Sequence, residues 1–193
     1  MIWRYSKWRL RRKNMKIKGN KVIIRSKKAA DAENDYRWQT DPELSALDAM
    51  TPTVMPYAEF YREYLNWLRH PYYGRITFGV DTPEGKHIGN CVYYNIDEVK
   101  NETEIGLMIG ERDYWNKGYG ADVISTLVEY IFHKTKFKRV YLKTLEDNFR
   151  AQRCFEKCGL APCGHKEQDG YKFLLMDISF ARWRERRNHN NQD

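Results

Sequence analysis

The chain has 193 residues, of which 41% are hydrophobic and 15% aromatic, and it carries a formal net charge of +8. This composition suffices for one domain with its own core and excludes a disordered chain. No apolar run is long enough to cross a bilayer, and the basic N-terminus lacks the apolar block and cleavage site of a secretory signal. We therefore expect a cytoplasmic protein without membrane contact.

The positive charge is concentrated at the two ends of the chain. Residues 1–28 hold 12 Lys and Arg and no acid, whereas residues 29–180 hold 18 basic and 24 acidic residues. We expect a flexible basic arm (1–19), a single domain (20–180) and a basic tail (181–193). The arm is either a solvated tail, with Met15 as an alternative start, or a contact for nucleic acid or a ribosomal protein.

Apolar periodicity and turn residues predict the elements in chain order. In the first half they indicate a strand at 21–25, a helix at 28–38 closed by the turn "TDPE", a helix at 56–70, and a β-hairpin made by "RITFGV" and "HIGNCVYYNI". In the second half they indicate a strand at 102–110, a helix from Gly118 to 133, a strand at 139–145, a helix at 148–159 and a strand at 171–180.

Strands and helices alternate from residue 102 to residue 159, which predicts a parallel strand pair. The hairpin before them predicts antiparallel neighbours. The expected fold class is α/β of the mixed α+β kind, with a central, mostly antiparallel sheet flanked by helices.

Two glycines mark the start of the helix after residue 118, in "YWNKGYGADV" (114–123). Glycines at a helix start let backbone N–H groups approach an anion, and the helix dipole adds positive potential. The stretch is therefore interpreted as a phosphate cradle supported by Lys117; a tight helix entry is the alternative. The stretch is not a P-loop, because the G-K-[ST] of that motif is absent. It is not a dinucleotide-binding fingerprint either, because Val123 occupies the position of the third glycine.

Three of the four cysteines, Cys154, Cys158 and Cys163, lie near His165. Three thiols and an imidazole can bind zinc, but spacings of four and five residues are not those of a zinc knuckle. Small buried thiols explain Cys154 and Cys158 equally well. We expect no metal.

Three motifs occur in an order that is typical of one enzyme family. "YWNKGYG" resembles its [QR]-x-x-G-x-[GA] cradle, with Trp115 in place of Gln or Arg, and "EIGLMIG" resembles the strand beside the cofactor. "NFRAQRCFEKCGL" resembles its N-x-R-A-x-x-x-Y-E-K-x-G-F helix. Over residues 20 to 180 the chain resembles the GNAT superfamily of N-acetyltransferases, and within it the branch that acetylates the N-termini of ribosomal proteins.

The resemblance implies an enzyme that moves an acetyl group from acetyl-CoA to a primary amine, on a protein N-terminus or a small molecule, by direct attack in a ternary complex. It implies a monomer or homodimer in which the parallel strands splay and the cofactor arm lies beside the backbone of Met108 and Ile109. The implied cofactor-binding residues are Met108, Ile109, Gly110, Trp115, Asn116, Lys117, Gly118, Tyr119, Gly120, Ala121, Asn148, Ala151, Phe155 and Lys157.

The implied catalytic groups are incomplete. Phe155 aligns with the family's Tyr, which protonates the leaving thiolate, and a phenyl ring cannot donate a proton. A thiol with a pKa of about 8.5 is a tolerable leaving group without an acid. The acceptor ammonium also needs a base, for which Glu104 is the candidate; a solvated acid at the strand edge is the alternative.

Two other classes of function compete with an acetyltransferase. Phe155 can mark a non-catalytic domain that only binds acyl-CoA, and the basic arm can make the chain a module that binds RNA or the ribosome. If the chain is an enzyme, its acidic body favours a cationic acceptor such as a polyamine, an aminoglycoside or a basic peptide N-terminus.

Overall fold

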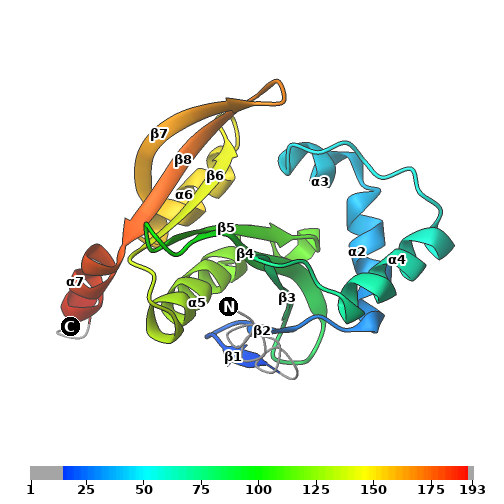
Figure 1. Ribbon diagram of the computed structural model, residues 1–193, viewed down its shortest axis with the longest axis horizontal. Coiled ribbons are helices and arrows are strands. Elements are labelled where there is room, and N and C mark those ends of the chain that lie inside the picture. Colours follow the sequence, from blue (N-terminus) through cyan, green and yellow to red (C-terminus); the bar gives the residue numbers. More distant parts are fainter. Residues whose placement is uncertain (1–14, 191–193) are drawn as a thin grey trace.

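The computed structural model describes residues 15–190, which form one eight-stranded sheet with helices around it (Figure 1). The strand order is β1-β2-β3-β4-β5-β6-β8-β7. The strands are β1 (Lys16–Lys18), β2 (Ile23–Ser26), β3 (Ile76–Asp81), β4 (His87–Asp97), β5 (Glu102–Ile109), β6 (Arg139–Leu145), β7 (Ala161–Gln168) and β8 (Tyr171–Ser179). The helices are η1 (Ala29–Asp31), α2 (Ala32–Gln39), α3 (Pro42–Leu47), α4 (Tyr57–Arg69), η2 (Arg112–Tyr114), α5 (Tyr119–Lys134), α6 (Phe149–Lys157) and α7 (Phe180–Asn190).

The sheet is mixed, and its one parallel pair among the described strands opens into a fork. β5 and β6 are paired only from Glu102 with Arg139 to Glu104 with Tyr141. Beyond that point β5 stays with β4 as far as Ile109, while β6 stays with β8 as far as Leu145. Figure 1 shows β6, β7 and β8 leaving the plane of the other strands. The predicted parallel pair and its splay are confirmed.

Helix α5 supplies most of the helical part of the core. Val123, Ile124, Leu127 and Ile131 recur at helical spacing and are fully buried, which is the apolar stripe that the sequence predicted. The strands contribute apolar side chains to the same cluster, among them Val80, Ile88, Ile105, Val140 and Leu142. The apolar stripe therefore fixes α5, and with it the glycines at its start, against the splayed strands.

Buried ion pairs attach the segment from η1 to α2 to the sheet. The Arg25 guanidinium donates to Asp31 (Nη2 to Oδ1, 2.7 Å) and to Asp81 (Nε to Oδ2, 2.8 Å), and Lys27 Nζ lies 2.7 Å from Asp35 Oδ2. All five side chains are at most one tenth exposed. Removing one partner would leave a buried charge without its counter-ion, which costs about 3–5 kcal/mol. The pairs hold α2 in place and thereby position α3.

The predicted turn "TDPE" is wrong, because it contains the start of helix α3. Asp41 accepts the N–H of Leu44 on its side chain at 3.0 Å, and Pro42 occupies the first turn, where no backbone donor is needed. The same residues that stop α2 thus open a second helix. α4 forms as expected, and Tyr64 is its buried residue.

The two basic ends are more ordered than predicted where the structure describes them. Strand β1 lies inside the range assigned to the basic arm, and residues 1–14 of that arm lie outside the described part of the chain. Helix α7 occupies most of the range assigned to the basic tail. Strand β7 was also missed, since Pro162 and Gly164 interrupt any apolar alternation in it.

Candidate active site

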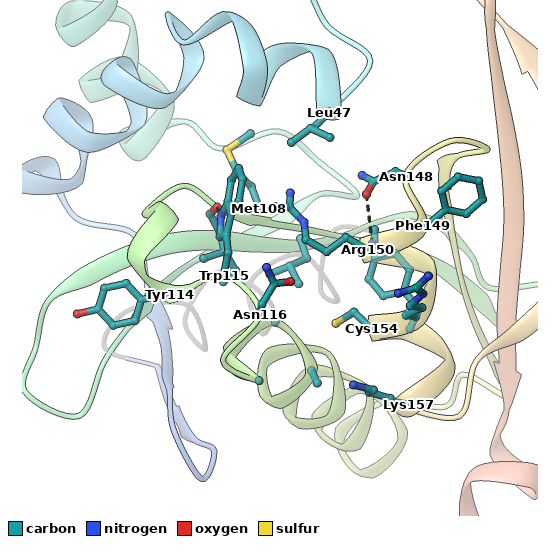
Figure 2. A pocket seen from close by; sticks show the side chains of 18 of the residues that line it. Leu47, Met108, Tyr114, Trp115, Asn116, Asn148, Phe149, Arg150, Cys154 and Lys157 are labelled. Carbon is teal, nitrogen blue, oxygen red and sulfur yellow. Dashed lines mark hydrogen bonds between the residues drawn. The ribbon is translucent and has the colours of Figure 1, made fainter.

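A cleft of about 470 Å³ lies where β5 and β6 part (Figure 2). Its walls come from β5, from the segment that leads into α5, from α6 and from the end of α3. The side chains and backbone that form it include Leu44, Leu47, Asp48, Leu107, Met108, Ile109, Trp115, Asn116, Gly118, Gly120, Ala121, Asn148, Arg150, Ala151, Arg153, Cys154, Phe155 and Lys157.

Most of the cofactor-binding residues expected from the sequence line this cleft. Those that do are Met108, Ile109, Trp115, Asn116, Gly118, Gly120, Ala121, Asn148, Ala151, Phe155 and Lys157. Gly110, Lys117, Tyr119 and Glu104 are not among the lining residues. Gly110 instead makes room for Trp38, because a Cβ there would lie 2.1 Å from the indole ring.

The start of α5 has the geometry of an anion site. Gly118 has a φ of +84°, a left-handed conformation that favours glycine. The helical hydrogen bonds begin with Asp122 N donating to Gly118 O, so the N–H groups of the three residues between them have no acceptor inside the helix. Gly118, Gly120 and Ala121 line the cleft. The donors of the first turn are therefore available to a negatively charged ligand.

Lys21 adds a cation behind this helix start. Its Nζ donates to the carbonyl of Lys117 at 3.0 Å and lies 5.7 Å from the centre of the Tyr119 ring. Asp122 holds the turn that carries Lys21, since its carboxylate accepts the N–H groups of Asn20, Lys21 and Val22 at 2.7–3.1 Å. Sequence reasoning missed Lys21 because nothing local links a β-turn to a helix about a hundred residues away.

The edge of β5 that faces the fork is set by backbone alternation. The N–H of Gly110 donates to Ile88 O on the β4 side at 3.0 Å. Since backbone groups alternate between the two edges of a strand, those of Met108 also point to β4, and those of Leu107 and Ile109 point into the fork. We expected the backbone of Met108 and Ile109 beside the cofactor; the register turns the backbone of Leu107 and Ile109 into the fork and that of Met108 toward β4, while Met108 still lines the cleft.

Trp115 connects this edge to α6. Its Nε1–H donates to Ile109 O at 2.6 Å, and the guanidinium of Arg150 lies 3.6 Å from the ring centre. A cation over an indole face is favourable, most strongly where water is excluded. Arg112 lies on the same ring at 5.6 Å and binds Asp41 and Glu43 of α3. The residue that departs from the Gln or Arg of the motif thus links β5, α6 and, through Arg112, α3.

Helix α6 presents the residues of the third motif to the cleft. Asn148 Oδ1 accepts the N–H of Ala151 at 3.1 Å, which is the contact of a helix N-cap (Figure 2). Phe155 is buried, with 7% of its surface exposed, and its ring is part of the cleft wall. Every basic side chain among the lining residues comes from this helix: Arg150, Arg153 and Lys157.

Two carboxylates, Glu104 and Asp48, are candidates for the base that the acceptor ammonium needs. Glu104 is 5% exposed, and its two oxygens accept the Tyr94 hydroxyl at 2.6 Å and the Asn95 amide at 2.8 Å. Asp48, just after α3, lies in the cleft wall and was missed because α3 was taken for a turn. Asp48 is exposed, but desolvation by the protein around its carboxyl raises its pKa to about 6, against the opposing charges of Arg75 and Lys143.

The cysteines do not gather around a common centre. Cys158 Sγ donates to the carbonyl of Cys154 at 3.2 Å along α6, and Cys163 Sγ lies 3.6 Å from an Arg139 nitrogen. Within residues 15–190 no group of three His, Cys, Asp or Glu side chains is arranged to hold a metal ion. In the same residues no helix has the length and apolar character of a membrane span.

Comparison with protein families gives one matching domain. A model described as an acetyltransferase (GNAT) domain matches residues 21–161. An uncharacterized N-acetyltransferase of Bacillus licheniformis named p20 is 24% identical over 171 residues, which cover 83% of this chain and 96% of p20.

Solved structures share the fold at low identity. A spermidine N-acetyltransferase of Vibrio cholerae, in complex with CoA and spermine, superposes with a TM-score of 0.73 at 16% identity, over 84% of this chain and 98% of that one. An aminoglycoside acetyltransferase in complex with coenzyme A has a TM-score of 0.73 at 19% identity, over 86% of this chain and 99% of that one.

Proposed function

The chain belongs to the GNAT acetyltransferase family, and we propose that it transfers an acetyl group from acetyl-CoA to a primary amine in the cleft between β5 and β6. The observation that carries this proposal is the fork itself. β5 parts from β6 after three paired residues, and at the same place α5 begins with a glycine in the left-handed conformation. A thioester cosubstrate needs both features, a slot for its arm and a cradle for its phosphates.

The residues present fit acetyl-CoA. The first-turn N–H groups of α5 would hold the diphosphate, with Lys21 increasing the positive potential from behind. The free edge of β5 offers backbone groups of Leu107 and Ile109 to the amides of the arm, although the Ile109 carbonyl already accepts from Trp115. When bound, acetyl-CoA supplies the acetyl group as a thioester, which an amine can attack directly.

The chain's own groups can assist the transfer at the base of the fork. A backbone N–H of the β5 edge, with that of Leu107 the first choice, would stabilise the negative oxygen that forms on attack. Phe155 would shield the sulfur from water but cannot protonate it. Glu104, the base proposed from the sequence, would act through the Tyr94 hydroxyl, because that hydroxyl and Asn95 already bind its oxygens.

The acceptor that these features favour is a cationic amine. The body of the chain is acidic, and structural neighbours include a spermidine acetyltransferase with spermine bound and an aminoglycoside acetyltransferase. A polyamine is therefore the first acceptor to test. An aminoglycoside and a basic peptide N-terminus are the next two.

An acceptor screen tests the proposal. Purified protein with acetyl-CoA is offered spermidine, kanamycin and a basic peptide with a free N-terminus, and free thiol release is followed while mass spectrometry identifies the product. We expect thiol release that depends on at least one amine and yields an acetylated amine. Binding of acetyl-CoA without transfer to any amine would instead support a non-catalytic acyl-CoA-binding domain.

A further inference from the structure

The cleft has an unequal distribution of charge between its walls. Among its lining residues the basic side chains all lie on α6, and the one carboxylate, Asp48, lies at the end of α3. Figure 2 shows Leu47, the residue before Asp48, on the opposite side of the cleft from Asn116 and the start of α5. The α3 wall is therefore the place where a positive group of a ligand would be held.

The position of Asp48 is fixed by the end of its helix. Its backbone N–H donates to Leu44 O at 3.2 Å and to Ser45 O at 3.1 Å, which closes the last turn of α3. Ala49 then takes a φ of +54° and turns the chain away. The start of α3 is tied to η2 by Arg112, which binds Asp41 and Glu43. A side chain on such a support has a defined location relative to β5.

Asp48 interacts electrostatically with groups on two strands and with the residue before a third. The cations are Arg75, just before β3, and Lys143 on β6, and each of them lowers the pKa of Asp48. From β4, Tyr94 is close enough for the charge of Asp48 to raise the pKa of its hydroxyl. Arg75 also lies 5.0 Å from the Tyr94 ring, and the Tyr94 hydroxyl donates to Glu104. Tyr94 thus lies within electrostatic range of Asp48 and binds Glu104, the last residue of β5 that is paired with β6.

The apolar residues of the cleft favour the protonated form of the Asp48 carboxyl near neutral pH. Leu44, Leu47, Leu107 and Met108 line the same cleft, and although Asp48 itself is exposed, desolvation by the protein around its carboxyl outweighs the two cations and raises its pKa to about 6. A base is most effective when its pKa lies near the working pH. An aspartate with the ordinary pKa of about 3.9 would bind the proton about a hundredfold more weakly.

We propose that Asp48 is the catalytic residue that binds the acceptor ammonium and accepts its proton. This inference rests on the proposed acetyltransferase function. A proton passes from the ammonium nitrogen to the Asp48 carboxylate, and the freed lone pair attacks the acetyl carbonyl carbon. The new C–N bond forms, the C–S bond breaks with its electron pair going to sulfur, and the second proton on nitrogen neutralises the thiolate.

The kinetic test compares Asp48→Asn with Glu104→Gln, and Glu33→Gln at an exposed position of α2 is the matched control. With spermidine as the amine, we expect Asp48→Asn to lower kcat/KM about a hundredfold at pH 7, the lower end for loss of a general base. The rate should recover toward pH 9–10, where more of the amine is already neutral, and acetyl-CoA affinity should not change. A wild-type rate and pH profile in Asp48→Asn would overturn the proposal, as would a pH-dependent loss found only in Glu104→Gln.

Two measurements without acetyl-CoA keep the inference separate from the proposed function. Calorimetry with spermidine alone should show binding to the wild type and at least tenfold weaker binding to Asp48→Asn; equal binding would contradict the ammonium site even if no amine were acetylated. Thermal unfolding gives the second readout. Because the pKa of Asp48 is raised in the folded state, the wild type loses stability as the pH rises from about 4, the unfolded pKa, through 6, so Asp48→Asn should melt higher than the wild type at pH 8 and no higher at pH 4. No difference at pH 8 would overturn the proposed environment of the carboxyl.

Discussion

The two walls of the cleft differ in charge and in the way the chain builds them. The wall that we propose for the cofactor (the cofactor wall) is made by α5 and α6, which carry three basic side chains and the N–H groups behind Gly118. The wall that we propose for the acceptor (the acceptor wall) is made by α3 and the residue after it, with two leucines and Asp48. An anionic cosubstrate would be drawn to the first wall and a cationic amine to the second, so that each reactant has its own side of the fork.

The two walls also differ in what positions them, which is local sequence for one and tertiary contacts for the other. The cofactor wall is built from short motifs in which neighbouring residues in the sequence act together. The acceptor wall depends on where a six-residue helix comes to lie, and that position is set by Arg112 and by the ion pairs around Arg25. The first wall can therefore be recognised from the sequence, and the second has to be seen in the fold.

The largest expected effect is on the cofactor wall, at Gly118. A non-glycine residue at a φ of +84° costs about 1–2 kcal/mol, and a β-branched side chain costs more. Gly118→Val should therefore move the first turn of α5 and weaken acetyl-CoA binding at least tenfold in calorimetry. Space is not the reason, because the nearest atom to a Cβ there is Lys21 Nζ at 3.7 Å.

Gly170→Val is the matched control for this change. Gly170 has a φ of +80° in the turn between β7 and β8, with no atom within 4 Å of a Cβ, and it lies outside the cleft. It should lower the melting temperature through the same backbone strain and leave acetyl-CoA affinity unchanged. Equal affinity loss in both variants would mean that strain alone, and not the cradle, weakens binding.

A smaller effect is expected behind the same wall, at Lys21. Removing its charge should weaken acetyl-CoA binding a few-fold, about 0.3–1 kcal/mol, the usual range for a charge at a helix end. The loss in Lys21→Met should shrink as salt is raised, since screening already weakens the interaction. Lys18→Met, an exposed change on neighbouring β1, should have no such effect. An equal loss of acetyl-CoA affinity in both variants would show that the net charge of the protein, and not the contact of Lys21 with Lys117, is responsible.

Sequence reasoning predicted the cofactor wall better than the acceptor wall for identifiable reasons. The stripe on α5 and the caps of α6 are local patterns, so both helices and the positions of Gly118 and Asn148 could be predicted. The edge of β5 that faces the fork depends on its register with β4, and this register turns the backbone of Leu107, and not that of Met108, into the fork. Asp41 and Pro42 suit a turn and a helix start equally well, and this ambiguity hid α3 and with it Asp48.

The smallest expected effect is at Phe155, which forms part of the cofactor wall near the sulfur in the proposed complex. If departure of the thiolate does not limit the rate, Phe155→Tyr should change the turnover number by less than tenfold, because a thiol leaves adequately without an acid. Steady-state kinetics with the best amine of the screen measures this. A gain of a hundredfold or more would show that the native chain lacks a needed acid and would favour a domain that binds acyl-CoA without using it.

The most direct test of the whole account is a titration of the ¹⁵N-labelled protein with acetyl-CoA, followed by its backbone amide resonances. The account predicts the largest shifts at Gly118, Gly120 and Ala121 in the cradle and at Leu107 and Ile109 on the free edge of β5. The amides of α7 and of the turn at Gly170 should not move. Shifts confined to the basic helix α7, with none at the start of α5, would contradict the placement of the cofactor in the fork.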